Sequence, residues 1–114
     1  MIHIKKGDEI WYYKILNDDY YGRPVSGISE LQRSIVTNIT QETTYHDLEL
    51  IHYQLYNGEN ITNIGCNIYT NEHDAIINYN NSIKLQCRIC DEHINKIIEL
   101  KQELESKLIK EKAL

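Results

Sequence analysis

The chain has 114 residues, the usual size of one domain, and hydrophobic residues make up 41% of it, enough for a modest core. Its net charge of −5 and pI near 5.5 argue against a general nucleic-acid-binding protein, because neutralising phosphates requires clustered Lys and Arg side chains. No run of about 18 apolar residues predicts a membrane span, and residues 1–9 lack the apolar region of a signal peptide, so we expect a cytoplasmic protein without a membrane partner.

Short runs rich in Ile, Val and Tyr predict β-strands in the first 70 residues. Asn57-Gly58 is a strong hairpin signal, since both residues tolerate a positive φ angle. Three or four antiparallel strands are expected, from segments 7–16, 25–40, 44–56 and 61–68, with a polar loop at 17–24.

Tyr and Trp must supply the large aromatic side chains of the core, because the sequence contains no Phe. A buried Tyr needs a hydrogen-bond partner for its hydroxyl, so we expect some of these side chains to be half exposed, where they can face a ligand. The core candidates are Trp11, Tyr53, Tyr56 and Tyr69.

A helical period begins near Asn71 and continues almost to the C-terminus. Asn71 is the expected N-cap, with Asp74 at the third helical position. The poor helix formers at 80–82 leave two alternatives, a continuous helix or a helix that breaks there. One heptad frame defines an apolar seam, which consists of Ile76, Ile83, Cys90, Ile97 and Leu104 at one position and Asn80, Cys87, Ile94, Lys101 and Leu108 at the companion position.

A continuous helix over residues 72–112 would be about 60 Å long at about 1.5 Å per residue, longer than a small β module can cover. We therefore expect an α+β fold in a single domain. A small antiparallel β-sheet or SH3-like barrel occupies residues 1–70, and a long C-terminal helical segment occupies residues 71–114. The seam of that segment is expected to pack against another copy, which makes the protein a homo-oligomer.

The spacing Cys87-x-x-Cys90-x-x-His93, with Cys66 elsewhere, is similar to a set of zinc ligands. Cys87 and Cys90 lie one helical turn apart, but His93 lies almost two turns from Cys87, a long reach around one tetrahedral ion. Because the heptad frame places both cysteines in the seam, we interpret them as small apolar seam residues. We expect no metal, no other cofactor, and free thiols rather than disulfides.

No group of residues with catalytic spacing is visible in the chain. The five His residues are scattered, and none is accompanied by a Ser or Cys nucleophile at a supporting spacing. We therefore expect a protein that is not an enzyme.

Lys84 and Arg88 share one face of the predicted helix, with Asn81 one turn before Lys84. An ammonium, a guanidinium and an amide on one face suit a phosphate or a nucleotide. The alternative is a solvated face on which the two cations pair with Asp91 and Glu92.

Three short motifs follow one another: Gly7-Asp8-Glu9-Ile10-Trp11-Tyr12-Tyr13, Ile35-Val36-Thr37-Asn38-Ile39, and Ile68-Tyr69-Thr70-Asn71-Glu72-His73-Asp74-Ala75. This layout resembles small phage proteins in which an SH3-like barrel precedes a C-terminal helix. It most resembles the first family of Thoeris anti-defence proteins. The abundance of residues with A/T-rich codons fits a low-GC bacterium, its phage or a similar virus.

Members of that family are sponges that sequester cyclic ADP-ribose signals and related cyclic nucleotides without cleaving them, and they oligomerise through their helices. The resemblance implies a ligand site made of Arg88, Lys84, Asn71 and Tyr69, in which Tyr69 stacks on the base. It also implies that the protein works in the host-cell cytoplasm. The chain departs from the family pattern in having one Arg on the helix, Arg88, where a pair is typical.

Two functions from different classes are therefore expected. The first is a phage sponge that binds a cyclic nucleotide signal in a concave pocket containing Arg88 or Lys84. The second is an inhibitor that blocks a host or bacterial defence protein through an acidic surface, and it needs no such pocket.

Overall fold

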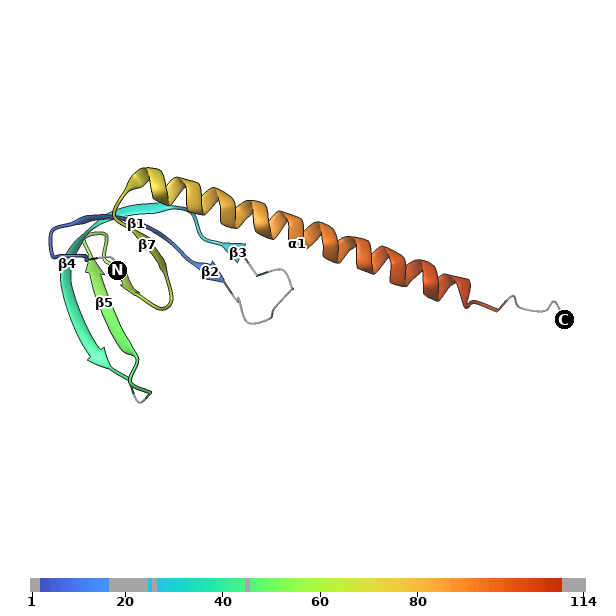
Figure 1. Ribbon diagram of the computed structural model, residues 1–114, viewed down its shortest axis with the longest axis horizontal. Coiled ribbons are helices and arrows are strands. Elements are labelled where there is room, and N and C mark those ends of the chain that lie inside the picture. The colour runs from blue at the N-terminus through green and yellow to red at the C-terminus, as the bar shows by residue number, and fades with distance from the viewer. Residues whose placement is uncertain (1–2, 17–24, 26, 45, 110–114) are drawn as a thin grey trace.

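The computed structural model describes residues 3–16, 25, 27–44 and 46–109. Figure 1 shows a bent β-sheet at one end of the molecule and a long helix, α1 (Glu72–Ser106), that projects away from it. This arrangement confirms the predicted α+β fold. The polar loop expected at 17–24 lies outside the described residues. Within the described part of the chain, no helix is both long and apolar enough to cross a membrane.

Seven strands are formed by the described residues, and they pair only with antiparallel neighbours. They are β1 (Glu9–Tyr13), β2 (Ile15–Leu16), β3 (Gly27–Ile28), β4 (Gln32–Thr43), β5 (Glu49–Leu55), β6 (Asn60–Thr62) and β7 (Asn67–Tyr69). Five of them make one sheet in the order β6-β5-β4-β1-β7, and β2 and β3 form a separate hairpin. The predicted segments 7–16, 25–40 and 61–68 therefore each contain two strands.

β4 is the strand on which the sheet bends (Figure 1). Its residues before Val36 pair with β1, whereas those from Val36 onward pair with β5, and the register shifts between Val36 and Asn38. Such an irregularity bends a strand and increases its twist. No hydrogen bond joins β6 to β7 among the described residues, so the sheet curves without closing. Its strand order, with a hairpin between β1 and β4, is that of an SH3-like barrel, one of the two expected arrangements.

The core lies on the inner side of the bent sheet and follows the strand period of two. Ile10 and Tyr12 are two residues apart on β1 and therefore point to the same side. Its buried members are Ile10, Tyr12, Val36, Tyr53, Leu55 and Ile61.

Tyr12 and Tyr13 are the most deeply buried aromatic side chains, each 2% exposed. They were not among the expected core aromatics. Adjacent strand residues point to opposite sides, so Tyr12 enters the core while Tyr13 lies on the other face, beneath α1. The expectation for Tyr56 was wrong, because this residue lies in the turn after β5 and is 81% exposed. Tyr53 is in the core as expected.

The Asn57-Gly58 turn joins β5 to β6 as predicted, but only Gly58 has a positive φ, of +89°. The Gly58 N–H donates to the Leu55 carbonyl at 2.9 Å, and the Leu55 N–H donates to the Glu59 carbonyl at 2.9 Å. The Asn57 side-chain amide donates to the Tyr12 hydroxyl at 2.8 Å. The turn is thereby attached to the core.

α1 is continuous through residues 80–82, so of the two alternatives the unbroken helix is the one observed. The Asn71 side-chain oxygen accepts a hydrogen bond from the Asp74 N–H at 3.1 Å, which confirms Asn71 as the N-cap. The helix has 35 residues and is therefore about 52 Å long at about 1.5 Å per residue. Its length accounts for most of the 79 Å long axis of the molecule.

Tyr13 attaches the first turns of α1 to the sheet. Its ring stacks on Tyr69 at 6.2 Å between centroids and meets Tyr79 edge-on at 5.2 Å. Its hydroxyl lies 2.8 Å from the Ser82 Oγ and also donates to the Asn78 carbonyl at 3.3 Å. Ser82, which was expected to weaken the helix, is thus a contact between the helix and the sheet.

We predict that Tyr13→Phe lowers the free energy of unfolding by about 1–2 kcal/mol, because the Ser82 and Asn78 polar groups lose their buried partner while the ring packing remains. Urea denaturation followed by circular dichroism measures this change. Tyr56→Phe is the matched control, since its side chain is exposed, and it is expected to change stability by less than about 0.5 kcal/mol. Equal effects of the two variants would contradict the role given to Tyr13.

Candidate functional site

The four residues implied as a ligand site form two separate pairs within one copy of the chain. Tyr69 and Asn71 lie where β7 passes into α1, whereas Lys84 and Arg88 lie further along the helix. The helical rise from Asn71 to Lys84 is about 20 Å, at about 1.5 Å per residue. Asn71 and Lys84 therefore cannot contact the same phosphate group of a nucleotide on one copy.

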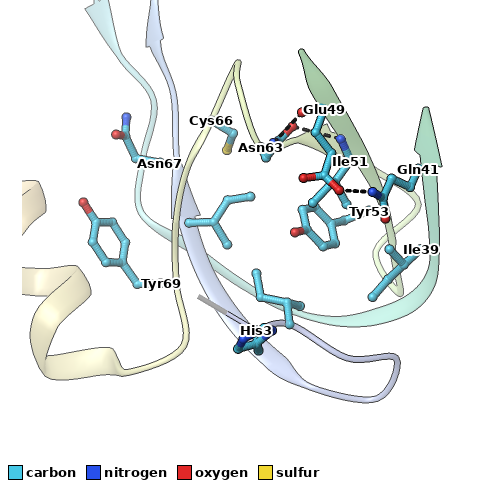
Figure 2. A pocket seen from close by; sticks show the side chains of 12 residues that line it. His3, Ile39, Gln41, Glu49, Ile51, Tyr53, Asn63, Cys66, Asn67 and Tyr69 are labelled. Carbon is cyan, nitrogen blue, oxygen red and sulfur yellow. Dashed lines mark hydrogen bonds between the residues drawn. The ribbon is translucent and has the colours of Figure 1, made fainter. Parts of the chain in front are cut away.

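The first pair has structural partners already. The Tyr69 ring is partly buried against Tyr13, and burial, followed by the neighbouring Tyr13 hydroxyl, raises the pKa of Tyr69 to about 12. In Figure 2 the Tyr69 side chain lies on the helix side of β7. The side-chain oxygen of Asn71 is used by the helix cap. Both side chains therefore serve the junction between sheet and helix.

The second pair is exposed. Lys84 and Arg88 lie one turn apart on the solvent side of α1, and neither forms an ion pair with any described residue. The expected pairing of these cations with Asp91 and Glu92 is absent from the described ion pairs. Two unpaired cations one turn apart are able to bind an anion, although they line neither of the two cavities below.

The larger cavity has a volume of about 670 Å³ and lies inside the bend of the sheet, between β4 and β5 on one side and β7 on the other (Figure 2). The apolar part of its wall is formed by Ile39, Ile51 and Ile68. Glu49, Asn63 and Gln41 lie on the β4–β5–β6 side. The other residues that line it are His3, Ile4, Tyr53, Cys66, Asn67 and Tyr69.

The polar groups of this cavity do not form a catalytic set. The Cys66 thiol donates to the Tyr13 carbonyl at 3.4 Å, and burial raises its pKa to about 11, so it is not an activated nucleophile at neutral pH. The Glu49 carboxylate accepts from the Gln41 amide (Figure 2). Asn63 bonds the backbone of β5 through both side-chain atoms, at 2.9 Å to the Ile51 N–H and 3.1 Å to the Glu49 carbonyl.

A second, largely apolar groove of about 390 Å³ lies between β3 and the helix. Cys87 and Cys90 line this groove, whereas Cys66 lines the larger cavity, so the cysteines considered as zinc ligands are divided between two places. Among the described residues, no three His, Cys, Asp or Glu side chains are grouped as metal ligands. The remaining lining residues are Val25, Gly27, Ile28, Ile83, Gln86 and Asp91.

The charge of the β module is unevenly distributed. Residues 34–83 contain six Asp or Glu residues and no Lys or Arg. This stretch includes most of β4, all of β5, β6 and β7, and the first turns of α1. Glu42, Asp47 and Glu49 are exposed at the end of the β4–β5 hairpin. The sequence analysis expected an acidic surface for the inhibitor without naming its residues, although the gap between Arg33 and Lys84 is visible in the sequence.

We predict that Asn71→Ala lowers the free energy of unfolding by about 1 kcal/mol, because the Asp74 N–H loses its cap, and that Asn71→Ser retains most of the stability. Thermal melts of the two variants measure the capping role. A nucleotide titration of Asn71→Ser tests the ligand role separately, since Ser caps a helix without presenting an amide. Equal melting temperatures for wild type and Asn71→Ala would contradict the capping role.

Comparisons with known proteins were made for the whole chain. No protein-family model, curated protein or solved structure matches it. The resemblance to the Thoeris anti-defence family therefore depends on the three short motifs alone. The function has to be argued from the geometry and charge of the chain itself.

Proposed function

We propose that this chain is a non-catalytic inhibitor that binds a host or bacterial defence protein through the acidic surface of its β module. We also propose that its copies associate through α1. The observation that carries the first proposal is the absence of Lys and Arg from residues 34–83, which build most of that module. A partner with a basic surface is the chemistry that such a surface attracts.

The acidic hairpin is suited to protein binding because its carboxylates are exposed and held by local contacts. Glu42 Oε1 lies 2.9 Å from the His52 ring nitrogen. Glu49 accepts from Gln41 on the neighbouring strand. Asp47 has a φ of +59° at the hairpin end, and its N–H donates to the Thr44 carbonyl at 3.0 Å. These contacts limit the freedom of the hairpin, which lowers the entropy lost on binding.

The larger cavity also favours a protein partner over a nucleotide ligand. It is lined by Glu49 and His3 and by no Lys or Arg, so it offers a phosphate group one carboxylate and no permanent cation. The cations Lys84 and Arg88 line neither this cavity nor the groove in one copy of the chain.

We predict that the variant Glu42→Gln, Asp47→Asn, Glu49→Gln loses a protein that the wild type retains from a bacterial host lysate. Asn at position 47 tolerates the positive φ, so the fold is preserved. The matched control is Glu92→Gln, Glu99→Gln, Glu103→Gln, which removes the same charge from α1. The retained protein is identified by mass spectrometry, and its elution is expected to shift to lower salt as charge is removed. Equal retention by the hairpin variant would exclude the acidic surface.

A cyclic nucleotide sponge is the second candidate, and the exposed, unpaired cations Lys84 and Arg88 favour it. Because Asn71 lies about 20 Å from Lys84 along the helix in the same copy, a site using all four residues would combine two copies. Such a site would hold the ligand without cleaving it.

For the sponge, we predict binding of a member of a panel of cyclic ADP-ribose isomers and cyclic di- and trinucleotides in calorimetry. Charge-assisted hydrogen bonds contribute about 1.5–3 kcal/mol, so Arg88→Ala should weaken binding by roughly tenfold to a hundredfold. Heat denaturation should release the ligand intact, and co-purified nucleotide appears as absorbance at 260 nm. If no member of the panel binds, the sponge is excluded and the inhibitor remains.

A further inference from the structure

The distal part of α1 carries an apolar face that the β module does not reach. Every residue from Asp91 to Ser106, where α1 ends, is exposed, and Figure 1 shows this part of the helix projecting away from the sheet. The apolar seam residues on it are Ile94, Ile97 and Leu104, which are 53%, 52% and 55% exposed. Leu108 lies two residues beyond the helix, so the helical seam expected to reach it ends at Leu104. Aliphatic side chains repeated along one helical face are typical of an interface.

The seam continues into the groove beside β3. Ile83, Cys87 and Cys90 occupy the same heptad positions as the distal residues, and they line that groove together with Val25 and Ile28. The seam and the groove therefore form one apolar surface, which we call the seam–groove surface. Its helical part runs from Ile83 to Leu104, about 32 Å at about 1.5 Å per residue.

We propose that a second copy of the chain covers this surface as an antiparallel helix pair, with Leu104 and Leu108 of the second copy in the groove beside β3. In the register that centres the pair between Ile94 and Ile97, each seam residue meets one from the companion position. Ile94 lies opposite Ile97 of the second copy and Cys87 opposite its Leu104, and the residues that follow the second copy's helix, with Leu108, approach Ile83. This inference rests on the self-association part of the proposed function and is independent of the target.

The charged residues of α1 favour an antiparallel pair of helices over a parallel pair. In a parallel pair in register, Lys101 would face Lys101 of the second copy inside the seam, where two like charges repel each other. In the antiparallel pair, Lys101 lies opposite Cys90 instead. The antiparallel pair also brings Lys84 beside Glu105 of the second copy, and symmetry repeats this favourable contact. Arg88 remains on the outer face of the helix.

The groove beside β3 also favours the antiparallel pair. In the antiparallel register, the end of the partner helix reaches the groove and its two leucines cover the apolar side chains there. Each β module then lies at an opposite end of the paired helices. A parallel pair would leave the distal leucines facing each other, beyond the end of both grooves.

The first test is the mass of the assembly by light scattering. We expect two copies for the wild type and one copy for Ile97→Asp, Leu104→Asp, because an unpaired charge in the seam prevents pairing. The matched control is Asn95→Asp, Gln102→Asp, which adds the same charges to the outer face of the same turns and should remain dimeric. A wild type that is monomeric throughout the micromolar range would overturn the proposal.

The second test uses cysteine cross-links to determine whether the two helices pair in parallel or antiparallel orientation. In Leu104→Cys, Cys90→Ser, mild oxidation is expected to link Cys87 to the thiol introduced at position 104 of the other copy, as mapped by mass spectrometry of the linked peptides. Links joining Cys87 to Cys87, or position 104 to position 104, would show a parallel pair and overturn the proposal, while self-association itself would stand.

The third test is a charge exchange. Lys84→Glu places like charges beside Glu105 twice in the dimer and should raise its dissociation constant about tenfold. Glu105 also pairs with Lys101 of its own copy at 3.7 Å, so the double variant Lys84→Glu, Glu105→Lys is compared with Glu105→Lys alone. The double variant should associate about tenfold more tightly than either single variant, because opposite charges again face each other across the pair. Failure of the second change to rescue the first would exclude this register.

Discussion

The structure depends on the burial of two adjacent tyrosines in β1. Because neighbouring strand residues point to opposite sides, Tyr12 belongs to the core and Tyr13 to the contact with α1. Each hydroxyl has partners: Tyr12 lies 2.7 Å from the Gln32 Oε1 and 2.9 Å from the Glu59 Oε2, and Tyr13 reaches Ser82. In a chain without Phe, this pair supplies the large apolar surfaces of both contacts without an unsatisfied hydroxyl.

Some features could be predicted from the sequence because their causes are local. The cap at Asn71, the turn at Asn57-Gly58 and the periodic helix each depend on a few neighbouring residues, and each is present. The burial of Tyr12 and Tyr13 depends on which elements cover the two faces of β1, which is a property of the tertiary structure. The continuity of α1 through residues 80–82 likewise depends on the tertiary structure, because the Ser82 side chain forms a hydrogen bond with the Tyr13 hydroxyl. Local propensity alone favours a break there.

The candidate site was less accessible to sequence reasoning than the fold. Residues that share a face or a motif need not converge, and Asn71 lies about 20 Å from Lys84 along the helix. The two cavities, by contrast, are formed by residues distant in sequence, such as Ile39 and Ile68, or Ile28 and Ile83. The position of the carboxylates relative to these cavities favours a protein partner for the β module, and the two cations on α1 keep an anionic ligand as the second candidate.

The open sheet has a consequence for the behaviour of the protein at high concentration. Its two outer strands, β6 and β7, have only three residues each. Exposed strand edges are templates for intermolecular β-pairing and aggregation, and very short edges present too few backbone groups for a stable register. Uncontrolled growth through the sheet is thereby disfavoured, whereas the antiparallel helix pair proposed above would be finite and closed.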